Sequence, residues 1–122
     1  MAYQIVDPDG IEPLADRPVD ARSLSDAAGL ENVGLRVYTA APGQQLPLSY
    51  HYHDEQEEVF YVLEGTLHVE TPEEEFAVES GTAFVAEPGS PHRAFNPESA
   101  SSDLEVLALG APAVDDAHPY ER

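Results

Sequence analysis

Apolar and polar residues alternate in short stretches along most of this chain, and glycine or proline residues separate the stretches. Alternation with a period of two places successive side chains on opposite faces of a β-strand. Pro47 indicates an edge position or a bulge at the start of its strand. The pattern predicts strands over residues 35–39, 46–53, 59–63, 67–69, 76–78, 82–85, 92–96 and 104–109.

Helical patterns are nearly absent from the sequence. Only residues 23–29 suggest a helical turn, because Ser23 is a preferred N-cap and Gly29 a preferred residue after a helix C-terminus. Many short strands with almost no helix indicate an all-β sandwich or barrel. The 122 residues are enough for one domain with one core.

The two ends of the chain differ from this β-rich middle. Residues 1–34 read as an extended arm with a short edge strand at 3–6 and the helical turn, residues 35–110 as the barrel, and residues 111–122 as an irregular tail. The N-terminus lacks the basic and apolar regions of a signal peptide, and no apolar run approaches membrane-spanning length. We therefore expect a cytoplasmic protein that does not contact membranes.

The charge composition is strongly asymmetric. The chain has 24 acidic and five basic residues, a net charge of −19, and every basic residue is arginine. Such a chain repels nucleic acid and anionic lipid. Salt screens the self-repulsion, so the composition favours a halophilic protein over an ordinary acidic protein with a basic partner. Because cysteine is absent, histidine and carboxylate side chains must supply any metal ligands.

The stretch 51–58 is the strongest chemical signal. His51 and His53 are two residues apart, so a strand places both imidazoles on one face. Residues 54–57 have the length of a hairpin loop, and that hairpin places Glu58 opposite His53. Glu57 is the rival carboxylate, since a register slip of one residue would exchange the two.

His92 follows a loop rich in turn residues and can supply a third imidazole. Three imidazoles and one carboxylate suit a divalent transition metal, and manganese, iron, nickel, cobalt and zinc all accept these ligands. An octahedral ion would keep two open positions. The sequence therefore predicts a metal site made by His51, His53, Glu58 and His92. The other two histidines, His68 and His118, are expected to be surface residues or hydrogen-bonded core residues instead of ligands.

Two motifs in the sequence resemble those of the cupin superfamily. The first is His51-x-His53, Glu58 after four residues and Gly65 after six more. The second is formed by Gly81, Gly89, His92 and Asn96. The resemblance implies a jelly-roll β-barrel, a metal held by the four predicted ligands, and a homodimer. Glu87 and Ala94 depart from the pattern, since the motif has proline at the first position and often an aromatic residue at the second.

The resemblance implies several functions. Cupins of this pattern include dioxygenases, isomerases, epimerases and decarboxylases, so a metal-dependent enzyme that acts on a small, oxygen-chelating metabolite is the first hypothesis. A non-catalytic module that binds or senses a small molecule is the alternative, and a purely structural metal site is a third. No catalytic residue beyond the metal ligands is assigned.

Strand parity nominates residues around the metal. The side chains expected on the inward face are Ser49, Phe60, Val62, Ala94 and Asn96. For Phe60, core packing is favoured over ligand contact. Arg36 and Arg93 are scarce cations that could orient a carboxylate, although a surface ion pair is the simpler role for each.

Overall fold

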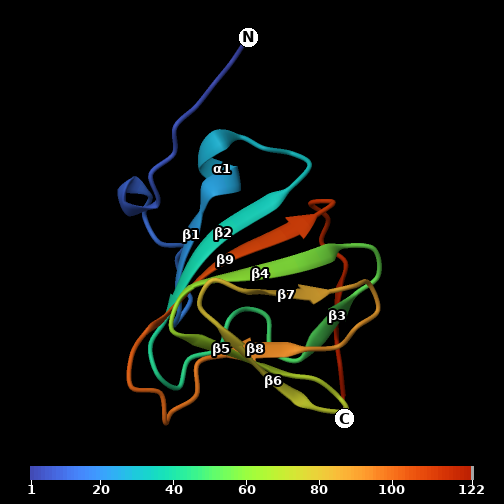
Figure 1. Ribbon diagram of the computed structural model, residues 1–122. Coiled ribbons are helices and arrows are strands. Elements are labelled where there is room, and N and C mark those ends of the chain that lie inside the picture. Colours follow the sequence, from blue (N-terminus) through green and yellow to red (C-terminus); the bar gives the residue numbers. More distant parts are fainter. Residues whose placement is uncertain (122) are drawn as a thin grey trace.

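The computed structural model describes residues 1–121 and consists mostly of antiparallel β-strands (Figure 1). Its elements are η1 (Pro8–Gly10), β1 (Asp20–Ser23), α1 (Leu24–Ala28), β2 (Gly34–Ala40), β3 (His51–His53), β4 (Glu57–Glu64), β5 (Thr66–Glu70), β6 (Glu75–Glu79), β7 (Ala83–Ala86), β8 (Arg93–Phe95), β9 (Leu104–Ala111) and β10 (Ala117–Pro119).

The strands form one large sheet and two small ones. The five-stranded sheet has the order β1-β2-β9-β4-β7, and a three-stranded sheet β6-β5-β8 and a two-stranded sheet β10-β3 face it (Figure 1). Neighbours in each sheet are antiparallel and mostly not consecutive in sequence. This arrangement is a jelly-roll β fold, as predicted.

The hydrophobic core lies between the large sheet and the small sheets. On β4, Phe60 and Val62 are buried while Tyr61 between them is exposed, which is the predicted alternation. Leu67 and Val69 of β5 close the core from the opposite side. One face of each sheet therefore excludes water, and burial of these side chains stabilises the fold by about 1.5–3 kcal/mol each.

The helical turn forms where the sequence predicts it. The Ser23 side chain accepts a hydrogen bond from the Asp26 amide, and Gly29 ends α1 in the left-handed conformation at φ 69°. None of the helices within residues 1–121 is long and apolar enough to cross a membrane.

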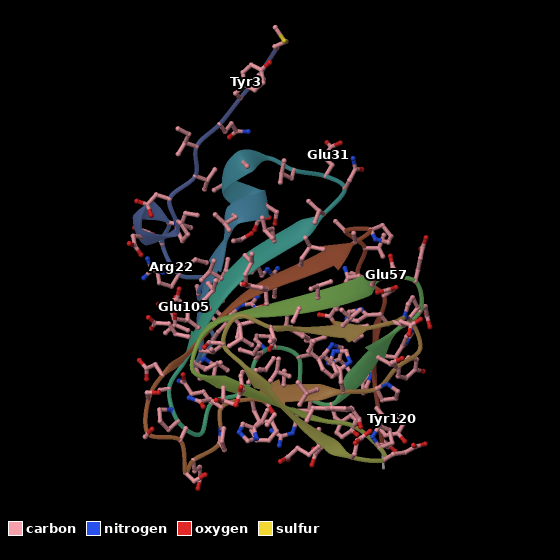
Figure 2. The ribbon with its side chains drawn as sticks, in the orientation of Figure 1. Tyr3, Arg22, Glu31, Glu57, Glu105 and Tyr120 are labelled. Atoms are coloured by element: carbon pink, nitrogen blue, oxygen red, sulfur yellow. The ribbon has the colours of Figure 1, made fainter. Side chains whose placement is uncertain are left out.

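Three local predictions are wrong. Residues 3–6 form no strand, and Tyr3 lies on an arm that leads away from the sheets, where its side chain is exposed (Figure 2). Residues 46–50 precede β3 as irregular chain, because the backbone amide of Leu46 pairs with Ala94 in an isolated contact instead of a ladder. The tail is not irregular, since its residues 117–119 form β10 and pair with β3.

Candidate metal centre

The four predicted ligands come from three separate parts of the chain. His51 and His53 belong to β3, which pairs with β10, and Glu58 belongs to β4. His92 sits beside His51, because the two residues exchange both backbone hydrogen bonds, at 3.1 and 2.9 Å. The topology thus brings two histidines from β3, one from the residue before β8, and a carboxylate from the large sheet to one place.

One carboxylate oxygen is the meeting point of the cluster. Glu58 Oε1 lies 2.9 Å from the Nε2 atoms of both His53 and His92, and 3.5 Å from that of His51. The ligand atoms of Glu58, His51 and His92 all lie within 4.8 Å of one another. The histidines are 2–9% exposed, so the cluster is largely shielded from water.

The opposite nitrogen of each ring fixes its orientation. The Nδ1 atoms of His51 and His92 lie 2.7 and 2.9 Å from the carbonyl oxygens of Ser49 and Ser90. A carbonyl oxygen only accepts hydrogen bonds, so each Nδ1 carries the proton and each neutral ring presents its lone pair at Nε2. Both lone pairs then point toward Glu58.

The donor set fits a divalent cation. Neutral imidazole lone pairs facing a carboxylate repel each other unless a cation, either a proton or a metal ion, lies between them. His53 Nε2 is buried without a hydrogen-bond partner of suitable geometry among residues 1–121, although Glu58 Oε1 is 2.9 Å away. A metal ion would satisfy this nitrogen, which supports the assignment of all four side chains as ligands.

Asp116 lies at the site, although nothing in the sequence singles it out. Its Oδ1 accepts a hydrogen bond from His53 Nδ1 at 2.8 Å, and its Oδ2 accepts bonds from the backbone amides of Glu55 and Gln56 at 2.6 and 3.0 Å. Asp116 therefore orients His53 and ties the loop after β3 to the C-terminal segment. In the sequence, Asp116 is one of several acidic residues in a tail that is predicted to be irregular.

Glu58 and His51 have perturbed acidities that reflect their contacts. Burial alone would raise the pKa of Glu58, but the His51 and His92 contacts and the nearby imidazole charges lower this pKa to about 2. Burial lowers the pKa of His51, but Glu58 and the Ser49 carbonyl outweigh it and raise this pKa above its ordinary value. The cluster therefore favours a carboxylate with positive charge beside it.

The hairpin used to choose Glu58 over Glu57 does not form. β3 pairs with β10, whereas β4 pairs with β7 and β9, so Glu58 lies opposite Ala86 and Gly110 instead of His53. The parity of β4 nevertheless holds, because Glu57 is exposed at one end of the strand (Figure 2). Glu58 reaches His53 across the gap between two sheets.

The predicted pocket residues lie elsewhere. Phe60, Val62 and Ala94 are buried in the hydrophobic core, and the Asn96 amide donates to the carbonyls of Ala40 and Ser102. Ser49 is exposed, because the chain before β3 is not a strand and its parity does not extend there. These five residues are absent from the lining of the cavity beside the cluster.

An open cavity of about 580 Å³ adjoins the ligand cluster. His51, His53 and Glu58 form one wall of it. Arg36 and Tyr38 of β2, which is separated from β4 by one strand of the same sheet, also line it. A small molecule in this cavity would reach the ligand cluster directly.

The chain belongs to the cupin family. Residues 36–110 match the family Cupin_2, whose description is "Cupin domain". This range contains the four clustered ligands and both motifs. No match was found among curated proteins.

Solved structures show the same fold. A sugar phosphate isomerase of the cupin superfamily from Silicibacter pomeroyi is 22% identical, with a TM-score of 0.82 and coverage of 98% of this chain and 83% of that protein. The polyketide cyclase RemF from Streptomyces resistomycificus is 21% identical, with a TM-score of 0.78 and coverage of 99% and 87%. A 25% identical protein from Acidithiobacillus ferrooxidans has a TM-score of 0.71, and the match covers 81% of this chain but only 62% of that protein's length.

Proposed function

We propose that this cupin is a metal-dependent enzyme of dioxygenase or isomerase type that acts on a small, polar, oxygen-chelating metabolite. The observation that carries the proposal is the convergence of three imidazole nitrogens on Glu58 Oε1. His51, His53, Glu58 and His92 would hold a divalent transition metal, which supplies a Lewis acid or an oxygen-activating centre.

The setting of the cluster favours a reaction site over a structural one. Three of the four ligands line an open cavity, so a bound ligand can approach them, whereas a purely structural site is closed. Two proteins of the same fold are named as a sugar phosphate isomerase and a polyketide cyclase, which supports an enzyme that acts on a small molecule. The chain itself would exclude bulk water behind the ligands through the buried His92 and Phe60.

Metal analysis followed by a substrate screen tests the proposal. The protein as purified should contain close to one equivalent of a transition metal by elemental analysis. Screening of the Fe(II)- and Mn(II)-loaded protein against small polyols, hydroxy acids and sugar phosphates, with and without oxygen, should reveal metal-dependent turnover. Saturable binding without turnover would instead identify a binding module, and failure to retain any metal would refute the metal site.

A homodimer, a halophilic character and a cytoplasmic location also belong to the proposal. The arm carries the exposed apolar side chains of Tyr3 and Ile5, and a second copy of the chain that covers them would make a homodimer. The net charge of −19 supports a halophilic protein that works at the high salt of such a cytoplasm. Light scattering at molar salt tests the dimer, since a monomeric mass would contradict it.

A further inference from the structure

The inward face of β2 forms part of the lining of the cavity beside the ligand cluster. Arg36 and Tyr38 share this face, because they are two residues apart on one strand. The Arg36 guanidinium Nη1 donates to the Tyr38 hydroxyl at 3.4 Å, and both residues line the cavity. A cation and a hydroxyl are thus placed together in the cavity that three of the ligands also line.

Arg36 differs from the other arginines that belong to the strands. Arg22 pairs with Asp20 at 3.1 Å, and Arg93 pairs with Glu70 at 3.2 Å. Within residues 1–121, no carboxylate lies within 4.0 Å of the Arg36 guanidinium, although the chain has 24 acidic residues. Since arginine stays charged at all ordinary pH values, this guanidinium keeps free donors for an anionic group.

Small residues form the cavity floor between Arg36 and Glu58. In the register of the large sheet, Ala108 lies opposite Arg36, and Gly110 lies opposite both Gly34 and Glu58. β2 and β4 flank β9, so their backbones are about 10 Å apart. Ala108 fills little of this span, and the Gln56 side chain, which lies over Gly110, is itself part of the cavity lining. The cavity of about 580 Å³ leaves room for a small molecule beside the guanidinium and the ligand cluster.

We propose that Arg36 and Tyr38 form a subsite for one anionic group, a carboxylate or a phosphate, on a small molecule whose other oxygens face the ligand cluster. This inference rests on the proposed function, because it names the substrate class of the same site. Guanidinium donors match the planar geometry of a carboxylate and the oxygens of a phosphate.

The rest of the lining limits the charge of the ligand. Asp26 and Asp115 also line the cavity, and the exposed Arg17 is the second arginine there. The acidic side chains would repel further negative charges beyond the one that Arg36 neutralises. We therefore expect small molecules with one anionic group to bind better than polyanions.

Binding of matched small molecules tests the subsite. Glycerate and glycerol 3-phosphate serve as the carboxylate and phosphate probes, and glycerol is their neutral counterpart. Calorimetry on the protein, both metal-free and loaded with Mn(II), should show that at least one anion binds and that glycerol does not. R36Q should weaken that anion about ten- to hundredfold, because it removes a charged hydrogen-bond donor. R36K should weaken it less, and Y38F should weaken it by a smaller factor than R36Q.

The control variant is R93Q, since Arg93 pairs with Glu70 instead of lining the cavity. R93Q should bind the anion as the unmodified protein does, and circular dichroism should show that R36Q is folded. Equal anion affinity in R36Q and the unmodified protein would overturn the subsite, as would the failure of both anions to bind. Metal content is measured separately, so a protein that binds anions through Arg36 but holds no metal would contradict only the proposed function.

Discussion

Glu58 has a role that its neighbour Glu57 cannot take, because successive residues of β4 face opposite sides of the sheet. Glu58 is largely buried among three imidazoles, whereas Glu57 is exposed. We expect E58Q to lower metal affinity by more than about tenfold, since an amide is a poorer ligand and lacks the charge. E57Q should leave the affinity unchanged. Competitive titration with a chelating dye measures both, and metal loss in E57Q alone would reverse the assignment.

Asp116 would act on a bound metal through His53. Its carboxylate holds the ring by Nδ1 and holds the loop by the amides of Glu55 and Gln56. D116N keeps the size of the side chain but removes the charge and one acceptor, so metal affinity should fall about 10- to 100-fold. The absorption spectrum of the Co(II) form should shift as well, because the ring is held less firmly.

The matched control for this variant is D115N, because Asp115 is the adjacent carboxylate and forms no hydrogen bond to a histidine within residues 1–121. The spectrum of D115N should match that of the unmodified protein. If D116N and D115N had the same Co(II) spectrum and metal affinity, Asp116 would have only a structural role.

At the scale of elements, the turn between β4 and β5 depends on Gly65. Its φ is +82°, and a Cβ there would lie 2.9 Å from the Asp103 carbonyl oxygen. Gly81 has the same φ of +82° but open space around its Cβ position. G81A should cost about 1–2 kcal/mol from backbone strain alone. G65A should cost at least about 1 kcal/mol more from the steric clash. Urea unfolding of both variants gives the comparison, and equal losses would show that the clash relaxes.

Strands with clear alternation could be predicted from the sequence, and the short strand β10, which is held only by its distant partner β3, could not. The alternation around Phe60 and Val62 is local, so β4 is visible in the sequence. β10 has only three residues, and Pro119 is one of them, so its pairing with β3 leaves no local signal. The stretch 46–50 resembles a strand, but the backbone amide of Leu46 donates a single hydrogen bond to the distant Ala94 carbonyl instead of joining a ladder.

The same distinction applies to the candidate site. The His51-x-His53 spacing and the parity of Glu58 are local, and the structure brings both together with His92. Asp116 reaches His53 over 63 positions of sequence, and no pattern in the tail distinguishes it from Asp115. The pocket prediction extended strand parity to Ser49, where the strand does not exist.

At the scale of the whole molecule, the net charge of −19 opposes folding through self-repulsion. Raising KCl from about 0.1 M to about 1 M shortens the screening length from about 10 Å to about 3 Å. The melting temperature should therefore rise steeply over this range. Sucrose at matched osmolarity does not screen charge and should raise it less. A melting temperature that is indifferent to KCl would contradict adaptation to salt.

Protons and metal ions compete for the same cluster, so pH should control how much a metal stabilises the protein. In the metal-free protein, the pKa of His51 is raised above 6.5, and this contribution to stability is complete below pH 6.5 and is lost as pH rises through the folded pKa. The pKa of Glu58 is lowered from 4.5 to about 2, so its contribution is present above pH 4.5 and is lost as pH falls toward 2.

Both contributions to stability are present at pH values between the ordinary pKa values of Glu58 and His51. The metal-free cluster therefore stabilises the fold most in this pH range. A metal ion replaces the protons, and it binds better as pH rises. The increase in melting temperature on adding Mn(II) should therefore be small near about pH 5.5 and much larger near about pH 8. In E58Q the increase should be reduced at both values, because the carboxylate that neutralises either cation is absent. An increase that is the same at both pH values would mean that the metal binds outside this cluster.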